Sequence, residues 1–207
     1  MLNDRTTPLS LLQTRRSGRP RDMVEPGPSP DELADMIRIA ARTPDHGKLH
    51  PWRFITVPRA RRDDFARLLR GAYWAERPTA DERKLESAEA SARQAPALVV
   101  VLSAPVRGHK IPLWEQEMSA GAAVMNLIHA AHAHGYAAGW ITGWVAESEQ
   151  VRRAFGANGE RIVGLVYIGT PAFPLEERER PDLARVHREW DGLESSPAIA
   201  GEGDRRA

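Results

Sequence analysis

Cysteine is absent from the 207 residues of this chain. The chain therefore cannot form disulfides, thiolate metal sites or a thiol nucleophile, which fits a reducing compartment. No apolar run approaches the roughly 20 residues that a membrane-spanning helix requires. The first twenty residues also lack the apolar segment and the cleavage pattern of a secretory signal. We therefore expect a cytoplasmic protein without a membrane partner.

Neither sign of charge dominates, because 29 Lys and Arg stand against 28 Asp and Glu, for a formal net charge of +1. The two signs are interleaved along the chain, and this pattern argues against nucleic acid as a partner. A hydrophobic fraction of 42% and a charged fraction of 28% are typical of globular proteins. We expect one domain over residues 1–190 and a disordered tail over 191–207.

Several common signatures of nucleotide and acyl chemistry are also missing. No GxGxxG motif follows a strand pattern, no GxxxxGK[ST] motif occurs, and no GxSxG motif occurs. These absences argue against a dinucleotide-binding crossover, a P-loop ATPase and an α/β-hydrolase. A cofactor, if one binds, has to be held by another arrangement of side chains.

The hydrophobic pattern alternates between helices and a few buried strands, which predicts an α+β domain with one central sheet. Strand patterns lie at residues 53–57, 97–102, 137–142 and 162–168. Helical patterns lie at residues 8–17, 30–42, 64–69, 112–134 and 149–155. Gly71 is expected to stop the third helix. Residues 79–94 are polar and rich in alanine, so we expect an exposed helix there, or a mobile flap over residues 75–93.

Histidines could suggest a metal site on the long helix at 112–134. His129 and His132 are three residues apart and share a helix face, but a metal needs three or four converging ligands. We therefore interpret these two histidines as part of a partly exposed helix face, and we expect no metal.

Basic side chains gather at two predicted helix ends. Arg15, Arg16 and Ser17 end the first helix, and Arg42 and His46 follow the second. Guanidinium groups beside a hydroxyl suit a phosphomonoester. The alternative for either cluster alone is a solvated helix end favoured by the helix dipole.

A third segment, GYAAGWITGW at residues 135–144, favours a phosphate-containing cofactor over solvated helix ends. Its glycines permit close backbone approach, and Trp140 offers a flat wall for a planar ring. Phosphate donors beside a flat wall suggest FMN as a cofactor. The alternative for Trp140 and Trp144 is core packing, which we favour for Trp144.

With these segments, the sequence resembles the nitroreductase-like flavoproteins. The resemblance runs from about residue 11 to residue 171 and covers most of the chain. The segments that carry it are LLQTRRS (11–17), RTPDHGKLHPWRF (42–54), HKIPLWEQEMSAGAAVMN (109–126), HGYAAGWITGW (134–144) and IVGLVYIGTP (162–171). The PDH and PW pair and the WEQEMSAG block are specific to the family, whereas the glycine-rich strand alone is weak evidence.

The resemblance implies a nitroreductase-like fold, with a central, mostly antiparallel sheet flanked by helices. It also implies a homodimer with two FMN sites at the interface, each built from both chains. Arg15, Arg16 and Ser17 match the motif that grips the FMN phosphate and ribityl chain. Arg42 and His46 match cofactor contacts from a second loop. The segment of Trp140, Ile141 and Thr142 matches a flavin-contacting stretch supplied by the partner chain.

One position departs from the family pattern. Relatives carry a basic residue between the Trp140 and Thr142 positions, and this chain has Ile141. The change predicts the loss of one polar contact and weaker cofactor affinity.

The resemblance implies an FMN-dependent oxidoreductase that takes hydride from NAD(P)H and passes electrons to nitroaromatics, quinones or similar electron-poor acceptors. One shared pocket for donor and acceptor predicts ping-pong kinetics. Arg16 and Arg42 are the candidates for a cation that stabilises the reduced flavin, and no dedicated acid or base residue is expected. The alternative, which the Ile141 change leaves open, is a protein that binds or sequesters flavin without turnover.

Overall fold

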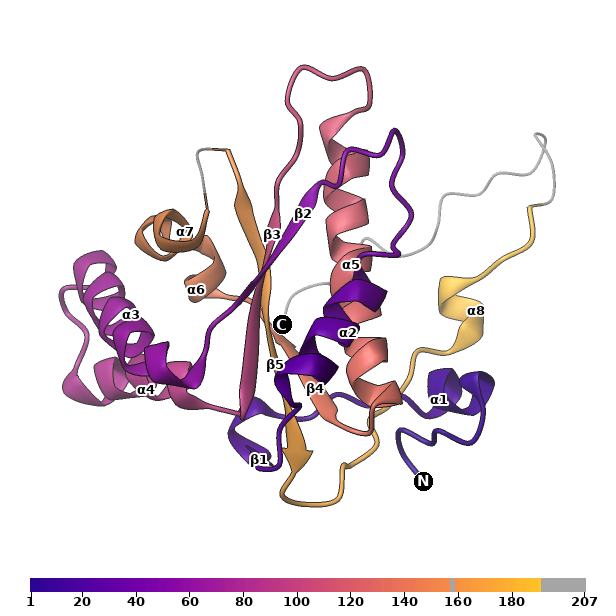
Figure 1. Ribbon diagram of the computed structural model, residues 1–207, viewed down its shortest axis with the longest axis horizontal. Helices are drawn as coiled ribbons and strands as arrows, with labels where there is room; N and C mark the ends of the chain where they lie inside the picture. Colours follow the sequence, from indigo (N-terminus) through magenta and orange to yellow (C-terminus); the bar gives the residue numbers. More distant parts are fainter. Residues whose placement is uncertain (157–158, 191–207) are drawn as a thin grey trace. The chain divides into compact units, whose positions relative to one another are not determined.

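The computed structural model describes residues 1–156 and 159–190 of the chain (Figure 1). The tail expected at 191–207 lies outside the described residues. Residues Met1–Glu176 form one compact unit. The domain boundary expected at residue 190 stays a prediction.

A single antiparallel sheet of five strands lies at the centre of this unit. Four of the strands follow the order β1-β5-β3-β2, and β4 also pairs with β5. The strands are β1 (Met23–Val24), β2 (Trp52–Thr56), β3 (Ala97–Ser103), β4 (Ala137–Ile141) and β5 (Arg161–Pro171). The four strands predicted from the sequence therefore exist, and β1 is too short to leave a hydrophobic pattern.

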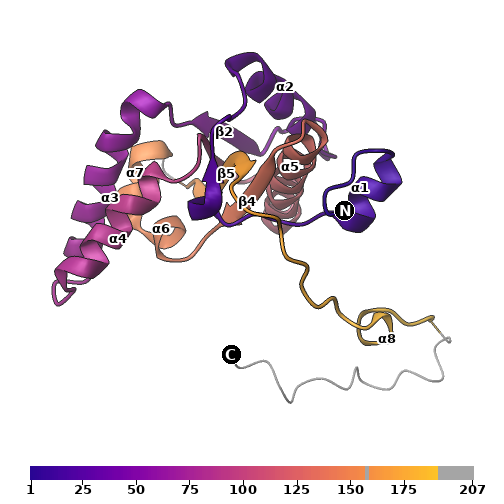
Figure 2. The same cartoon turned by 90° about the horizontal axis from the view of Figure 1, so that it is seen from below.

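Helices cover both faces of the sheet, as Figures 1 and 2 show. The helices of the unit are α1 (Pro8–Thr14), α2 (Pro30–Ala40), α3 (Arg62–Glu76), α4 (Glu82–Arg93), α5 (Leu113–Ala133), α6 (Trp144–Glu147) and α7 (Glu149–Phe155). One side carries α3, α4, α6 and α7, and the other side carries α2 and α5. The α+β prediction with an antiparallel sheet is confirmed.

Strand β3 explains why the sheet needs cover on both faces. All seven of its residues are buried. Leu98, Val100 and Leu102 join the core under α3 and α4. Val99 and Val101 join the second core, under α2 and α5. Side chains alternate between the two faces of a strand, so a continuous apolar run requires two cores.

The helix starts were readable from the sequence. Thr7 accepts a hydrogen bond from the Ser10 amide, and the Ser10 hydroxyl accepts one from the Thr7 amide. Ser29 and Glu32 form the same reciprocal capping box at the start of α2, with Pro30 as the first helical residue. These side chains satisfy amides that would otherwise lack partners, and this fixes where α1 and α2 begin.

One prediction about the α3–α4 region is wrong. Helix α3 does not stop at Gly71 but continues to Glu76, because its apolar face packs along α4 and offsets the intrinsic cost of glycine. The helix expected at residues 79–94 exists as α4, and most of its residues are exposed, but its Leu85, Ala88 and Ala92 are buried; the alternative of a mobile flap over residues 75–93 stays open. The sequence concealed this packing because alanine contributes little to a hydrophobic pattern.

A buried arginine joins the elements of this region. The Arg62 guanidinium donates to the carbonyls of Val57 (2.9 Å), Ala92 (2.9 Å) and Gln94 (3.1 Å), with Pro96 O at 3.4 Å. Only 6% of the residue is exposed. Burial lowers the pKa of the guanidinium below its usual value, but the group stays charged because arginine does not lose its proton in proteins. Its charge is met by carbonyl dipoles at the end of α4.

The segment after Glu176 is a separate unit in which residues 177–190 are described. Residues 177–190 include a short helix, α8 (Leu183–Val186), with Asp182 capping its first turn. Within the described part of the chain, none of the helices combines the length and apolar character that crossing a membrane would need.

Candidate functional site

The first predicted site segment, residues 15–17, leaves the end of α1 and runs beside β4. The Arg16 amide donates to Asn3 Oδ1 (2.7 Å), and Asn3 Nδ2 donates to the Arg16 carbonyl (3.1 Å). The Gly18 amide donates to the Ala138 carbonyl in β4 (3.1 Å). The backbone of this segment is therefore held at both ends. Asn3 was not singled out from the sequence, because one side chain that holds a distant backbone leaves no periodic pattern.

Gly139 permits this close approach. A Cβ atom at position 139 would lie 2.6 Å from the Gly18 carbonyl oxygen. That distance is shorter than any van der Waals contact, and the clash would be with backbone and not with a flexible side chain. A side chain on Gly139 would therefore push residues 15–18 away from β4.

We predict that Gly139→Ala lowers the free energy of unfolding by about 2 kcal/mol, the usual cost of overpacking. Urea unfolding measures the change. Gly71→Ala is the matched control, because a Cβ there has nothing within 4 Å and alanine is favoured over glycine in a helix by up to about 1 kcal/mol. Equal stability of the Gly139→Ala variant and the unmodified protein would contradict the proposed close contact.

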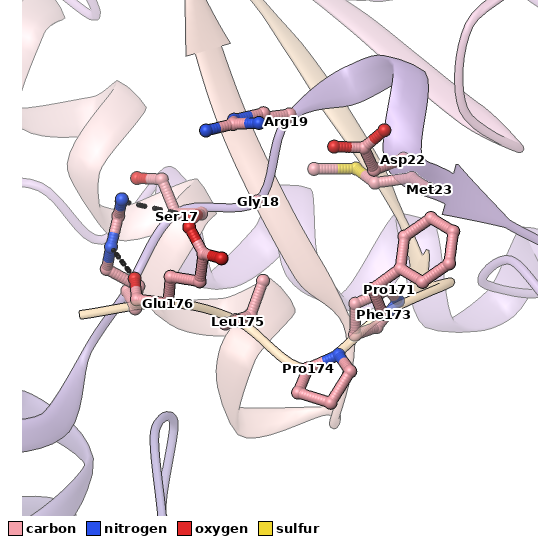
Figure 3. A pocket seen from close by; sticks show the side chains of 11 residues that line it. Ser17, Gly18, Arg19, Asp22, Met23, Pro171, Phe173, Pro174, Leu175 and Glu176 are labelled. Atoms are coloured by element: carbon pink, nitrogen blue, oxygen red, sulfur yellow. Dashed lines mark hydrogen bonds between the residues drawn. The ribbon is translucent and has the colours of Figure 1, made fainter.

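A cavity of about 210 Å³ opens beside this segment (Figure 3). Arg19 and Asp22 lie on one side of it, and Pro174 and Leu175 lie on the opposite side. The Arg16 guanidinium lines the cavity, donating from Nε to the Glu176 carbonyl (2.6 Å) and from Nη1 to the Ser17 carbonyl (3.2 Å). Arg15 Nη1 approaches the Ser17 hydroxyl at 3.4 Å. Two guanidinium groups and a hydroxyl thus gather on this segment, which suits an anionic group.

The third predicted segment, Trp140 to Thr142, follows directly on β4. The Trp140 indole N–H donates to the Val163 carbonyl (3.0 Å), and its ring lies over Gly164, where a Cβ would meet Nε1 at 2.0 Å. The indole is therefore held against β5, while 37% of Trp140 and 37% of Ile141 remain exposed. Thr142 is exposed. Trp144 packs edge to face on Tyr73 (4.8 Å between ring centres) beside the core, as predicted.

The second predicted segment contains the PDHG loop (residues 44–47), which is anchored along α5. Asn126 Nδ2 donates to the Thr43 hydroxyl (2.7 Å), and Ser119 Oγ donates to the Pro44 carbonyl (2.6 Å). His46 Nδ1 lies 2.6 Å from Glu115 Oε1. The loop is not helical, as the flanking prolines predicted, and Lys48 and His50 both have positive φ. The Arg42 guanidinium makes no hydrogen bond or ion pair with any residue that the structure describes.

These anchors place His46 far from Arg15 within one chain. His46 contacts Glu115 in the first turn of α5, whereas Arg15 acts electrostatically on His129 in its last turns. Fourteen residues of helix separate the two contacts, or roughly 21 Å at 1.5 Å per residue. Thr43, which follows Arg42 in the chain, contacts Asn126, a residue of α5 between these two positions. The structure therefore brings the segment of residues 15–18 against β4, but it keeps His46 at the opposite end of α5.

The residues that anchor the loop were not singled out from the sequence. Glu115 and Ser119 lie in the WEQEMSAG block that carries the family resemblance, but no spacing rule connects them to the PDHG loop. Their side chains face the loop because residues 115, 119 and 126 fall close to one line along an α-helix. The placement of residues 115, 119 and 126 on one face of a predicted helix is the sequence feature that could have indicated these contacts.

The prediction of a partly exposed histidine face on α5 is wrong for His132. His132 is fully buried, and neither of its ring nitrogens has a hydrogen-bond partner. Burial, the Arg15 charge and His129 together lower the pKa of His132 to about 4. Burial and Arg15 also lower the pKa of His129, whose buried Nδ1 lacks a partner. Both imidazoles are neutral at pH 7.

His132 gives the fold an acid-sensitive point. Its pKa is about 6.5 in an unfolded chain and about 4 in the fold, so below pH 6.5 the unfolded chain binds a proton that the fold excludes. The resulting loss of unfolding free energy is absent above pH 7, reaches about 2 kcal/mol at pH 5 and levels off at about 3 kcal/mol below pH 4. We predict that His132→Gln flattens the dependence of unfolding free energy on pH between 7 and 5. His187→Gln, at an exposed histidine, should leave it unchanged.

Known proteins similar to this chain belong to one family. The model of the nitroreductase family matches residues 12–170. Among curated proteins, the "Putative NAD(P)H nitroreductase YdjA" of Escherichia coli (strain K12) is 38% identical over 165 residues, which cover 79% of this chain and 87% of the relative. A "Putative NAD(P)H nitroreductase" of Haemophilus influenzae is 37% identical over 174 residues, which cover 83% and 91% of the two chains.

Solved structures share the fold. A nitroreductase-like family protein from Bacillus cereus superposes with a TM-score of 0.76 at 20% identity, covering 90% of this chain and 97% of the other. A nitroreductase with bound FMN from Bacteroides fragilis gives a TM-score of 0.64 at 22% identity, covering 84% and 94%. At these identities the likeness establishes the nitroreductase-like fold alone.

Proposed function

The chain belongs to the nitroreductase family of oxidoreductases, and we propose that it is an FMN-dependent NAD(P)H oxidoreductase that reduces nitroaromatics, quinones or similar electron-poor acceptors. The single observation that carries the proposal is the arrangement of residues 15–18 against β4. This segment carries two guanidinium groups and a hydroxyl, and it is hydrogen-bonded through Gly18 to β4, the strand that also contains Trp140. A bound FMN is also named for one structural neighbour, the Bacteroides fragilis protein.

The residues present fit FMN. A phosphomonoester needs several donors on a fixed backbone, and residues 15–17 supply them on a segment clamped by Asn3 and Ala138. A planar ring system needs flat or apolar walls, and Trp140 and Ile141 present partly exposed apolar surface beside that segment. The Trp140 indole is held in place by its hydrogen bond to Val163, so it needs little ordering when a ligand arrives.

We infer that each site is completed by a second chain. His46 lies about 21 Å along α5 from the Arg15 end, so one chain does not place both beside the same phosphate. An antiparallel arrangement of two α5 helices would bring His46 of one chain towards Arg15 of the other. Leu113, Trp114 and Met118 leave an apolar surface exposed on α5 that suits such contact. We therefore propose Arg42 and His46 as the partner's contribution, in place of the Trp140 to Thr142 stretch that the family resemblance assigned to the partner chain.

When bound, FMN would supply the hydride and electron transfer chemistry. The protein binds and orients. Arg15, Arg16 and Ser17 would hold the phosphate and ribityl chain, and Trp140, Ile141 and Thr142 would border the ring system. Arg42, which has no partner among the described residues, would present a cation to the same site, and Glu115 holds the His46 imidazole in one orientation. Donor and acceptor would use one pocket in turn, which gives ping-pong kinetics.

Ile141 favours one alternative function, flavin binding without turnover. The loss of the basic residue expected at this position removes a polar contact, and Ile141 is partly exposed where that residue would act. A protein that binds or sequesters flavin without turnover is therefore the second candidate function. Location in the cytoplasm and a single domain over residues 1–190 remain predictions from the sequence.

The absorbance of the purified protein tests the proposal. We expect a flavin spectrum, either on isolation or after addition of FMN, and anaerobic addition of NADH or NADPH should bleach it within the time of mixing. Addition of a quinone should then restore the colour. Flavin that binds but stays oxidised with both nicotinamides would support the sequestering alternative. A protein that remains colourless with excess FMN would contradict both functions.

A further inference from the structure

The ring of His46 is held by a carboxylate on α5. Its Nδ1 lies 2.6 Å from Oε1 of Glu115, which stands in the first turn of that helix. A carboxylate only accepts hydrogen bonds, so the proton of this contact has to lie on Nδ1. A neutral imidazole carries one ring proton, and Nε2 is then an acceptor without a hydrogen. The contact therefore selects one of the two tautomers of His46.

The backbone under this ring is fixed by a second carboxylate. Asp45 Oδ1 accepts from the Leu49 amide (3.0 Å) and Oδ2 accepts from the His50 amide (2.8 Å), and the Asp45 side chain is 11% exposed. Gly47 has a φ of +82°, and a Cβ there would lie 2.5 Å from Cδ1 of the buried Ile111. The turn that carries the imidazole is thus held on two sides by the chain itself.

The second ring nitrogen of His46 faces outward without a partner. Nε2 makes no hydrogen bond or ion pair with any residue that the structure describes, and the side chain is 66% exposed. The oxygens of a phosphate dianion only accept hydrogen bonds, so a neutral Nε2 cannot bind them. A hydroxyl or an N–H group can donate to it. FMN carries both kinds of donor, on the ribityl chain and at N3 of the ring system.

We propose that Glu115 is a positioning residue that sets the tautomer of His46, and that Nε2 of His46 accepts a hydrogen bond from a donor group of FMN and makes no contact with the phosphate. The inference rests on the proposed function, because it takes FMN as the cofactor. Glu115 acts only through the imidazole. The basic side chains then have different tasks, since Arg15 and Arg16 donate to the phosphate whereas His46 accepts.

Nitrogen NMR of the full-length protein tests the tautomer without a measurement of activity. Long-range ¹⁵N–¹H correlation spectra at pH 8, with and without FMN, should show His46 protonated at Nδ1 alone. Glu115→Ala should shift it towards the Nε2–H tautomer that free histidine prefers in water. Glu86→Ala, at an exposed glutamate on α4, is the matched control and should leave the His46 signals unchanged. An Nε2–H tautomer or an imidazolium in the unmodified protein would overturn the proposal.

Fluorescence titration with FMN tests whether Glu115 acts through the ring. His46→Ala should raise the dissociation constant about threefold to tenfold, the range for one neutral hydrogen bond. Glu115→Ala should raise it by a smaller factor, and Glu115→Gln, whose amide oxygen can still accept from Nδ1, should recover most of that loss. The double variant should bind no more weakly than His46→Ala alone. Additive losses would mean that Glu115 contributes separately, and its positioning role would be wrong.

A cofactor analogue identifies the donor. 3-Methyl-FMN lacks the N3–H group but keeps the ribityl chain and the phosphate. Equal sensitivity of FMN and 3-methyl-FMN to His46→Ala would assign a ribityl hydroxyl as the donor, and sensitivity of FMN alone would assign N3–H. Unchanged FMN affinity in His46→Ala would overturn the contact. A protein that binds no FMN would contradict the proposed function itself, and the His46 tautomer without FMN distinguishes that failure from a wrong role for Glu115.

Discussion

Replacing both Arg15 and Arg16 with glutamine is expected to give a folded protein that no longer retains FMN. Each guanidinium that contacts the phosphate contributes a charge-assisted hydrogen bond of about 1.5–3 kcal/mol. Loss of both removes about 3–6 kcal/mol of binding free energy, which raises the dissociation constant roughly 10²- to 10⁴-fold. Fluorescence titration of the variant with FMN measures the change. Arg38→Gln, at an arginine whose side chain is 72% exposed on α2, should bind FMN normally.

Mixing of variant chains tests whether two chains share each site. Chains with Arg15→Gln and Arg16→Gln keep Arg42 and the PDHG loop intact. Chains with Arg42→Gln and His46→Ala keep residues 15–17 intact. Each preparation alone should bind FMN poorly. A mixed dimer would contain one fully intact site and one doubly altered site, so mixing with exchange of chains should restore part of the flavin binding. If mixing restores none, the site lies within a single chain.

Arg62→Met is expected to lower the free energy of unfolding by about 4 kcal/mol. Methionine fills most of the space but leaves the carbonyls of Val57, Ala92 and Gln94 without their donor, and each buried acceptor that loses its partner costs about 1–3 kcal/mol before relaxation. Urea unfolding measures the loss. A protein of this size has a total stability of only about 5–15 kcal/mol, so the variant should be markedly easier to unfold.

The neighbouring residue provides the control. The Arg61 side chain is 74% exposed and pairs with Asp64. Exposed pairs contribute about 0–1 kcal/mol, so Arg61→Met should change stability little. Arg62→Lys keeps the charge but lacks the planar fork that reaches several carbonyls at once. It should recover only part of the loss. Full recovery by lysine would mean that charge, and not the fork geometry, holds this region together.

Much of the fold could be predicted from the sequence because its signals are local. The capping residues Thr7 and Ser29 marked two helix starts, and the apolar run of β3 marked the central strand. Strand β1 was missed because two residues leave no pattern. The end of α3 was misplaced because the packing of α4 against it, made by Leu85 and two alanines, is a tertiary effect that outweighs the intrinsic preference of Gly71.

The candidate site was less accessible to sequence reasoning. The side-chain types of Arg15, Arg16 and Ser17 indicated phosphate chemistry, and Trp140 indicated a flat wall. Their distribution in space could not be derived, because it depends on the hydrogen bond between Gly18 and β4 and on the contacts of the PDHG loop with α5. The burial of His132 was also hidden, since a helical pattern does not report what the N-terminal segment covers.

The separation of His46 from Arg15 along α5 has a consequence for the cofactor. If two chains complete each site, dissociation into single chains dismantles both sites, so FMN binding and chain association are thermodynamically linked. Dilution would then release flavin, and added FMN would draw single chains into pairs. The length of one helix would thereby make the yellow colour of a solution depend on how concentrated the protein is.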